Sequence, residues 1–235
     1  LMFGCLFGSL FLGLPVALGL GGTAVLFALV LTPRTLLAAP SAFFYTPWQA
    51  VLVTVPMFIF MAQLISEAGI VEEAFIAARR WLERLKGGLA IACIFASAAV
   101  GAMSGSSTAS AAAMASVAIP EMKKHGYTDT VAAGVVTVSG TLAIMIPPSI
   151  GLVLYGIITE NSIGQLLIAG IIPGILTAGI YCIGIVVWNR VQPGCMPPAT
   201  SHCSWRDKWL SLKPLWAFII LTLIVVGSIY LGLAT

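Results

Sequence analysis

Two short breaks in otherwise apolar stretches carry the residues best placed for chemistry. The first is the sequence SGSST at residues 104–108, and the second is IPPS at residues 146–149. Pro147 has no N–H group, so the carbonyl of Ala143 loses its helical partner, and Ser149 can cap a new helix after the break. Freed carbonyls and hydroxyls can coordinate a cation, and the N-terminus of a helix can face an anion.

Each break also has a plainer interpretation. Proline-kinked helices occur in many membrane proteins, and stretches rich in Gly, Ser and Ala often serve only to let helices pack closely. The two breaks, however, lie in neighbouring segments and near the middle of their apolar runs. Such a pair of interrupted segments is the best sequence indication of a transporter binding site.

The charged residues decide which ion and which class of protein fit these breaks. No Asp or Glu lies between residues 84 and 120 or between 130 and 159, and both His lie in loops. Proton coupling therefore has no evident carrier here, whereas sodium needs only oxygen ligands. The serines also lack a general base, and MSGSS is not the GxSxG motif, so we exclude a membrane enzyme. A channel and a purely structural membrane subunit remain alternatives.

The composition is that of an integral membrane protein. Of the 235 residues, 60% are hydrophobic and 8% are charged, whereas soluble domains carry about 25% charged residues. The net charge of +3 is small, and the Lys and Arg residues cluster in short loops. This distribution indicates membrane topology and not a nucleic-acid partner, so we expect an all-α protein that crosses the lipid bilayer several times.

The apolar runs divide the chain, because about 20 such residues cross the hydrocarbon core. The predicted order is scaffold transmembrane helices at 1–69, an amphipathic interfacial helix at 70–87, a hairpin at 88–120, a broken transmembrane helix at 129–159, a transmembrane helix at 161–190, a cytoplasmic loop at 191–213 and a further transmembrane segment at 214–235. Whether 1–32 forms one broken helix or two short helices stays open.

Residues 70–86 have a different pattern from the apolar runs. Apolar residues such as Val71, Phe75 and Leu82 recur there with helical spacing,. Glu72 and Glu73 suit the N-terminal end of such a helix,. We expect a helix that lies along the membrane surface, with a helix packed on a partner domain as the alternative.

Basic residues flank the 88–120 segment on both sides. Arg79, Arg80, Arg84 and Lys86 precede it, and Lys123 and Lys124 follow it. The positive-inside rule places both flanks in the cytoplasm, and one crossing would separate them. A re-entrant hairpin keeps both flanks on one side and explains a length of 33 residues. Its SGSST tip would then lie at membrane depth, which requires that it be buried in protein or line a watery cavity.

These motifs together resemble one known family. Residues 101–176, from GAMSGSSTASAAAMASVAIPEMKKHGY through IMIPPSIGLVLYG to SIGQLLIAGIIPGIL, are similar to the large membrane subunit of tripartite ATP-independent periplasmic (TRAP) transporters. GLPVALGLGG at 13–22 and VPMFIFMAQLISEAGI at 55–70 look similar too, so the resemblance covers most of 1–190. It is specific because the tip, the IPEMKKHGY loop, the IPPS break and the SIGQLLIAGIIPG stretch occur in the family's order.

The resemblance implies an architecture and a function. The chain would be one inverted repeat of an elevator-type transporter, with a re-entrant helical hairpin and a broken transmembrane helix, and 214–235 would begin the second repeat. The expected activity is sodium-coupled uptake of an organic acid, such as a C4-dicarboxylate, a sugar acid or sialic acid, across the bacterial inner membrane. The implied partners are a small four-helix membrane subunit and a periplasmic substrate-binding protein. A sodium-coupled elevator anion transporter without a binding protein is the alternative.

The resemblance and the two breaks together give a set of candidate site residues. We expect sodium between the tip and the break, held by Ser104, Ser106 and the carbonyls of Ala143, Ile146 and Pro148. We expect the substrate carboxylate at the helix ends, near Gly105, Ser107, Thr108 and Ser149. The chain departs from the family at Ala143, where many members have Gly, which gives the backbone there less freedom.

Overall fold

A computed structural model describes residues 2–31, 69–197 and 205–213 continuously, with isolated residues elsewhere. Every regular element in these described residues is a helix. The chain forms two compact units, Leu1–Val53 and Thr54–Thr235. The predicted transmembrane segments near 51–69 and 214–235 fall mostly outside the described residues, so they stay predictions.

The first unit contains two helices, α1 (Met2–Phe11) and α2 (Val16–Leu31), which pack against each other. They are separated by a turn in which Gly13 has a φ of +79°, a conformation that glycine adopts without steric cost. Pro15 follows the turn and has no N–H group with which to continue α1. The 1–32 run is therefore two short helices, which settles the question that the sequence leaves open.

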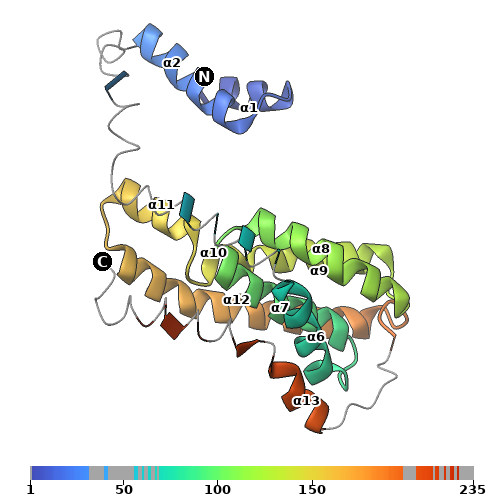
Figure 1. The fold of residues 1–235 in the computed structure, drawn as a ribbon. Helices are drawn as coiled ribbons and strands as arrows, with labels where there is room; N and C mark the ends of the chain where they lie inside the picture. The colour runs from blue at the N-terminus through green and yellow to red at the C-terminus, as the bar shows by residue number, and fades with distance from the viewer. Residues whose placement is uncertain are drawn as a thin grey trace. The chain divides into compact units, whose positions relative to one another are not determined.

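The continuously described part of the second unit starts with α6 (Ile70–Leu82), which is followed by a helical hairpin of α7 (Gly88–Ser104) and α8 (Ser107–Lys124). The hairpin occupies the predicted 88–120 segment and turns at the predicted tip (Figure 1). Gly105 makes the turn possible because its φ is +60°, a value that disfavours residues with a side chain. Its depth in a membrane stays a prediction.

The broken helix follows the hairpin. It consists of α9 (Asp129–Gly140), the single turn α10 (Leu142–Met145) and α11 (Ile150–Thr159). The parts before and after the prolines are inclined by 43°. The next helix, α12 (Ile163–Val191), is long and apolar enough to cross a bilayer. Among the described residues, α9, α10 and α11 would form a second such span if they cross the bilayer together as one broken helix.

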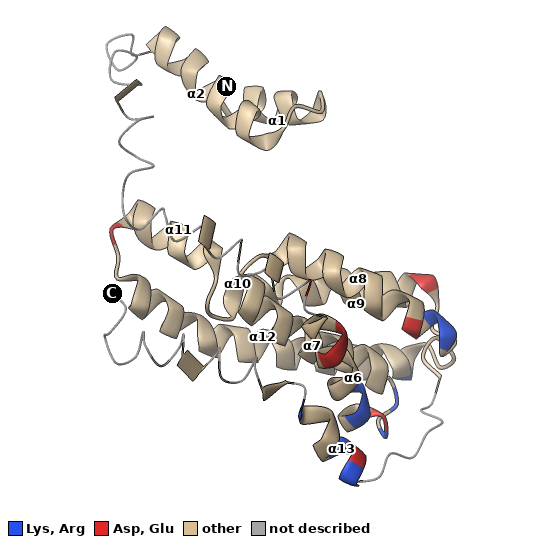
Figure 2. Ribbon diagram, viewed as in Figure 1, with Lys and Arg blue, Asp and Glu red and all other residues tan. Residues whose placement is uncertain are grey.

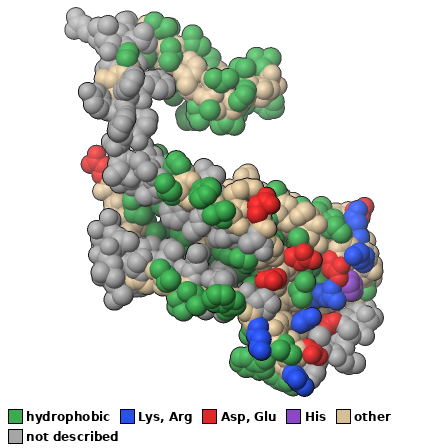
Figure 3. Space-filling view, in the orientation of Figure 1, with side chains coloured by type: hydrophobic (Ala, Val, Ile, Leu, Met, Phe, Trp, Pro, Cys, Tyr) green, Lys and Arg blue, Asp and Glu red, His purple; other side chains and the backbone are tan. Residues whose placement is uncertain are grey.

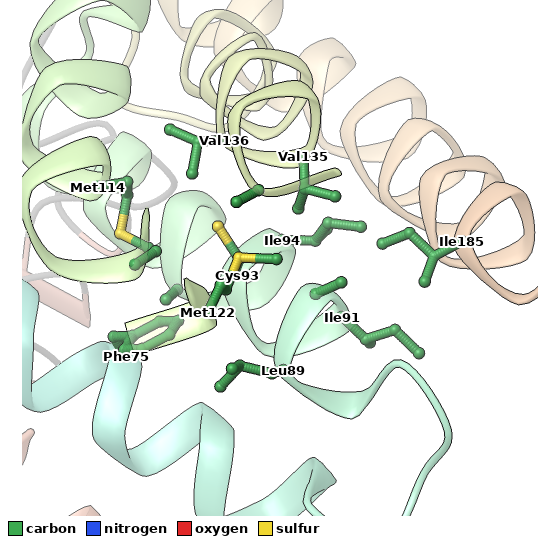
Figure 4. Close-up of a cluster of buried hydrophobic side chains, with 14 of the residues drawn as sticks. Phe75, Leu89, Ile91, Cys93, Ile94, Met114, Met122, Val135, Val136 and Ile185 are labelled. Atoms are coloured by element: carbon green, nitrogen blue, oxygen red, sulfur yellow. The ribbon is translucent and has the colours of Figure 1, made fainter. Parts of the chain in front are cut away.

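The core of the second unit lies between α7, α8 and α9, with α6 and α12 closing its sides. Figure 4 shows Phe75 of α6 and Met114 of α8 on one side of Cys93 of α7, with Ile94 of α7 and Ile185 of α12 on the other. In a bilayer these contacts stabilise the fold through close packing, because lipid tails are as apolar as the side chains.

Two further segments pack on the core of the second unit. The apolar face of α6 is covered by α7, and Val71, Ala74 and Phe75 are buried there. The protein, not a membrane surface, therefore receives this face, and an interfacial position for α6 stays a prediction. The predicted cytoplasmic loop at 191–213 contains a helix, α13 (Trp205–Leu212), which packs on α6. The sequence analysis did not predict this helix, which is too short to be recognised from its pattern, and the cytoplasmic location of 191–213 stays a prediction.

The two ends of the hairpin lie side by side. Arg79 of α6 forms an ion pair with Glu121 near the end of α8, and Lys123 contacts Asp129 at the start of α9 at 3.0 Å. Charged residues gather at this end of the second unit (Figure 2). A single crossing would separate these flanks by the thickness of the bilayer, so their contact supports the re-entrant interpretation.

Labelling from one side of the membrane tests this topology. Lys86→Cys and Lys124→Cys, each in an otherwise cysteine-free transporter, are both expected to react with an impermeant thiol reagent from the cytoplasm. The reason is that the Arg79–Glu121 ion pair holds both flanks at one end of the hairpin. Inverted and right-side-out vesicles compare the two faces. Labelling of the two cysteines from opposite faces would make 88–120 a true transmembrane span.

Candidate functional site

The hairpin tip is built by two helix caps in succession. Gly105 ends α7, and its N–H donates to the Gly101 carbonyl at 2.8 Å. Ser106 then begins α8 from an extended backbone (φ −122°, ψ 122°), and its hydroxyl accepts from the Ala109 N–H at 3.4 Å. Ser104 lies beside this turn, where its hydroxyl donates to the Ser106 carbonyl at 3.3 Å. The predicted sodium ligands Ser104 and Ser106 are thus adjacent.

The helix break repeats the same cap on a second helix. Ser149 precedes α11 with almost the same backbone angles as Ser106 (φ −120°, ψ 124°). Its hydroxyl accepts from the Leu152 N–H at 3.4 Å. On the other side of the prolines, α10 ends where the Ile146 N–H donates to the Leu142 carbonyl at 3.0 Å. Both predicted breaks therefore produce a new helix N-terminus capped by a serine.

The tip and the break are in direct contact. The N–H of Ile150, the first residue of α11, donates to the Gly105 carbonyl at 3.2 Å. A Cβ atom on Gly105 would lie 2.9 Å from the Pro148 carbonyl oxygen and 3.1 Å from the Ile150 nitrogen. The backbones therefore approach as closely as only glycine permits, and residues 45 positions apart share one site.

Further glycines bring the surrounding helices equally close. A Cβ on Gly101 of α7 would lie 2.6 Å from the Ala143 Cα, and one on Gly140 of α9 would lie 2.7 Å from the Ala111 Cβ. On the other side of the break, a Cβ on Gly170 of α12 would lie 2.6 Å from the Met145 carbonyl oxygen. The break is enclosed by the hairpin and by α12.

The predicted sodium ligands lie in or beside this enclosed region. Ser104 is 6% exposed and Ala143 is fully buried, Pro148 is buried, and Ser106 and Ile146 are half-buried. All the proposed sodium ligands are neutral oxygens. The Ala143 carbonyl is among them because Pro147 has no N–H group with which to form its helical hydrogen bond. Within the described part of the chain, no three His, Cys, Asp or Glu side chains come together in a metal-binding group. The oxygens present suit sodium, which unwound carbonyls coordinate in transporters.

The predicted substrate residues divide into two groups. Ser107 is half-buried and Thr108 is exposed at the start of α8, so this helix N-terminus is accessible. Ser149 is fully buried and Gly105 is buried. The Ile150 N–H of α11 donates to the Gly105 carbonyl, so this N–H is not free to donate to an anion. The α8 end is thus the more accessible of the two, whereas at the α11 end Ser149 is buried and the Ile150 N–H already has a partner.

A buried group of hydroxyls below the tip is a feature that the sequence analysis missed. The Ser97 and Ser139 hydroxyls are 2.8 Å apart and join α7 to α9. The Ser110 hydroxyl donates to the Ser97 carbonyl at 3.4 Å, which ties α8 to α7. All three serines are fully buried. Ser97 lies seven residues before Ser104, on the same face of α7, and this spacing is the signal that could have revealed it.

Comparison with known proteins identifies the family of this chain. The family described as "Tripartite ATP-independent periplasmic transporter, DctM component" matches residues 3–235. A C4-dicarboxylate TRAP transporter large permease protein, DctM, from Pseudomonas aeruginosa is 36% identical over 221 residues, which are 93% of this chain and 50% of that protein. The sialic acid TRAP transporter large permease protein SiaM from Vibrio cholerae is 31% identical over 228 residues, 96% of this chain and 52% of that protein.

A third relative carries a different substrate in its name. The ectoine TRAP transporter large permease protein TeaC from Halomonas elongata is 34% identical over 185 residues, 78% of this chain and 42% of that protein. The chain thus spans about half the length of the curated relatives it matches. These relatives are permease subunits and not enzymes, in agreement with the exclusion of an enzyme. The chain belongs to the family of membrane-integral DctM components of tripartite ATP-independent periplasmic transporters.

Proposed function

We propose that this chain is half of the large permease subunit of a sodium-coupled transporter that takes up an organic acid across the bacterial inner membrane. The observation that carries the proposal is the contact between the hairpin tip and the helix break, with a serine-capped helix N-terminus on each. The names of the relatives support a carboxylate such as a C4-dicarboxylate or sialic acid as cargo.

Sodium and the substrate would use different parts of this contact. Ser104, Ser106 and the carbonyls of Ala143, Ile146 and Pro148 would hold sodium. The N-termini of α8 and α11 would attract the carboxylate, since a helix N-terminus carries about half a positive charge. Residues 87–120 and 130–159 contain no Lys, Arg or His, so a nearby sodium ion adds the attraction that couples the two ligands.

The transport movement would be of the elevator type. The short close contacts at Gly101, Gly140 and Gly170 favour a tip and a break that move together as one body. The re-entrant hairpin would then carry the site through the membrane. A small four-helix membrane subunit and a periplasmic substrate-binding protein would complete the system, and that binding protein would select the substrate first.

Uptake by the complete transporter in proteoliposomes tests this function. An inward sodium gradient is expected to drive accumulation of the acid above its external concentration, whereas an equal potassium gradient or proton gradient is not. The binding protein is added outside, with the candidate acids tested one by one against it. Accumulation without the binding protein would favour the alternative, a sodium-coupled elevator anion transporter that needs no binding protein. Equilibration of the acid without accumulation would favour a channel.

The 235-residue chain alone is expected not to transport. It spans about half of its relatives' length, and a second hairpin and helix break are needed to close the proposed site. The measurement is sodium-driven uptake by the purified chain, compared with the complete subunit at equal protein density. Uptake by the chain alone would contradict the two-repeat architecture and favour a small homo-oligomeric carrier.

A further inference from the structure

The short helix α13 buries its lysine and exposes its tryptophans. Lys208 is 7% exposed, whereas Trp205 and Trp209 are each 63% exposed. Water favours the opposite arrangement, because lysine is among the residues that are almost never buried unless paired. The outward face of α13 is therefore suited to a less polar medium than water.

Specific contacts fix this orientation. The Lys208 ammonium donates to the Trp81 carbonyl at 3.3 Å, and the Trp81 indole N–H donates to the Lys208 carbonyl at 3.1 Å. The rings of Trp81 and Trp209 meet edge to face, with centroids 5.9 Å apart. Trp81 lies in the last turn of α6, where a cation complements the helix dipole. The lysine is thus used for docking, and the tryptophans face outward as a consequence.

The outward face combines aromatic and basic side chains. Trp205 and Trp209 are four residues apart and share one side of α13, and Leu210 beside them is 42% exposed. Arg206 and Lys213 are also exposed. We call these five residues the α13 platform. Residues 83–86 and 205–213 contain five Lys and Arg residues and two acidic residues, Glu83 and Asp207. These two segments together therefore carry a net positive charge.

The platform lies in the charged region of the second unit. Figure 2 places α13 near the basic residues of α6, and Figure 3 shows apolar surface over α13 bordered by Lys and Arg. Tryptophan is enriched where a membrane protein meets the headgroups, and basic clusters beside a membrane attract anionic lipids. Both preferences indicate the headgroup region of a membrane, and the family is membrane-integral.

We propose that the α13 platform is a binding surface for anionic phospholipid headgroups. Trp205 and Trp209 lie among the headgroups, and Arg206 and Lys213 bind their phosphates. Because Lys208 links α13 to the end of α6, the bound lipid anchors α6. This surface is separate from the contact between tip and break and does not depend on the proposed cargo.

A fluorescence experiment on the complete transporter tests the platform. Leu210→Cys in a cysteine-free background carries a bimane probe, and the protein is reconstituted in phosphatidylcholine with or without phosphatidylglycerol. Spin-labelled phosphatidylglycerol is expected to quench the probe more than spin-labelled phosphatidylcholine. Arg206→Gln with Lys213→Gln is expected to reduce this preference by about fivefold for each charge removed. Lys123→Gln with Lys124→Gln removes the same charge from α8 and is expected to leave the preference unchanged.

Three results would overturn the proposal. Strong quenching of the probe by aqueous iodide would place the platform in water. Equal quenching by the two spin-labelled lipids would remove the anionic preference. Shielding from both lipid and iodide that requires the small membrane subunit would identify a protein as the occupant instead.

Discussion

Replacing Gly105 by alanine is expected to reduce sodium-driven uptake by the complete transporter by about tenfold or more. Gly105 has a φ of +60°, and an added Cβ would lie 2.9 Å from the Pro148 carbonyl oxygen. Backbone strain of this kind costs about 1–3 kcal/mol, and about 1.4 kcal/mol is a factor of ten in rate. The clash involves backbone atoms, so the tip must leave the break and lose its hydrogen bond to Ile150. Initial uptake rates measure the effect.

Two glycines provide matched controls for this variant. Gly69 has a φ of +74° but open space around its Cβ position, so Gly69→Ala introduces the strain without the clash. Gly134 lies within α9 with nothing within 4 Å, so Gly134→Ala introduces neither. We expect Gly105→Ala to be much less active than both. If Gly105→Ala transports as well as Gly69→Ala at equal expression, the contact between tip and break is not needed for transport.

Placing a carboxylate at Ser149 is expected to abolish uptake. Ser149→Asp keeps a side chain that caps helices well, so α11 is expected to remain intact. The new charge would, however, lie in a fully buried position and repel the substrate carboxylate from the α11 end. Ser149→Ala removes a hydroxyl but adds no charge, so it is expected to weaken the apparent substrate affinity by about tenfold to a hundredfold, since one charge-assisted hydrogen bond contributes about 1.5–3 kcal/mol.

Ser149→Asn separates the effect of charge from that of size. Asparagine has nearly the shape of aspartate and also caps helices, so Ser149→Asn is expected to retain measurable uptake. Membrane insertion and binding to the small subunit are checked for each variant. Full transport by Ser149→Asp would show that the carboxylate does not approach this helix end. Equal loss in Ser149→Asp and Ser149→Asn would assign the effect to crowding.

The hairpin and the helix break could be predicted from sequence because each depends on local chemistry. Only glycine readily adopts the backbone of Gly105, and prolines remove helical donors wherever they occur. Ser106 and Ser149 are likewise recognisable as caps without any knowledge of the tertiary structure. Basic flanks then give the hairpin its topology, and the Arg79–Glu121 ion pair agrees with that topology.

The features that the sequence did not reveal depend on distant partners. Helix α13 is stabilised by Trp81, which lies 127 positions before Lys208, so no local pattern indicates it. The pairing of Ser97 with Ser139 joins residues on different helices. The sequence also predicts two equivalent helix ends for an anion, whereas the contact between Gly105 and Ile150 occupies one N–H group of the α11 end. Long-range contacts, not local preferences, decide which predicted groups are free.

The sodium dependence of uptake by the complete transporter tests the proposed site most directly. Ser106→Ala removes a hydroxyl ligand from the tip, and Pro148→Ala restores an N–H group that can occupy a carbonyl freed by the break. Ser116→Ala, on the same helix α8, removes an exposed hydroxyl that bonds to the Ala113 carbonyl, and it serves as the control. Sodium between tip and break predicts a higher half-saturating sodium concentration for Ser106→Ala and Pro148→Ala and an unchanged one for Ser116→Ala. An unchanged sodium dependence in both Ser106→Ala and Pro148→Ala would contradict a sodium site at this contact.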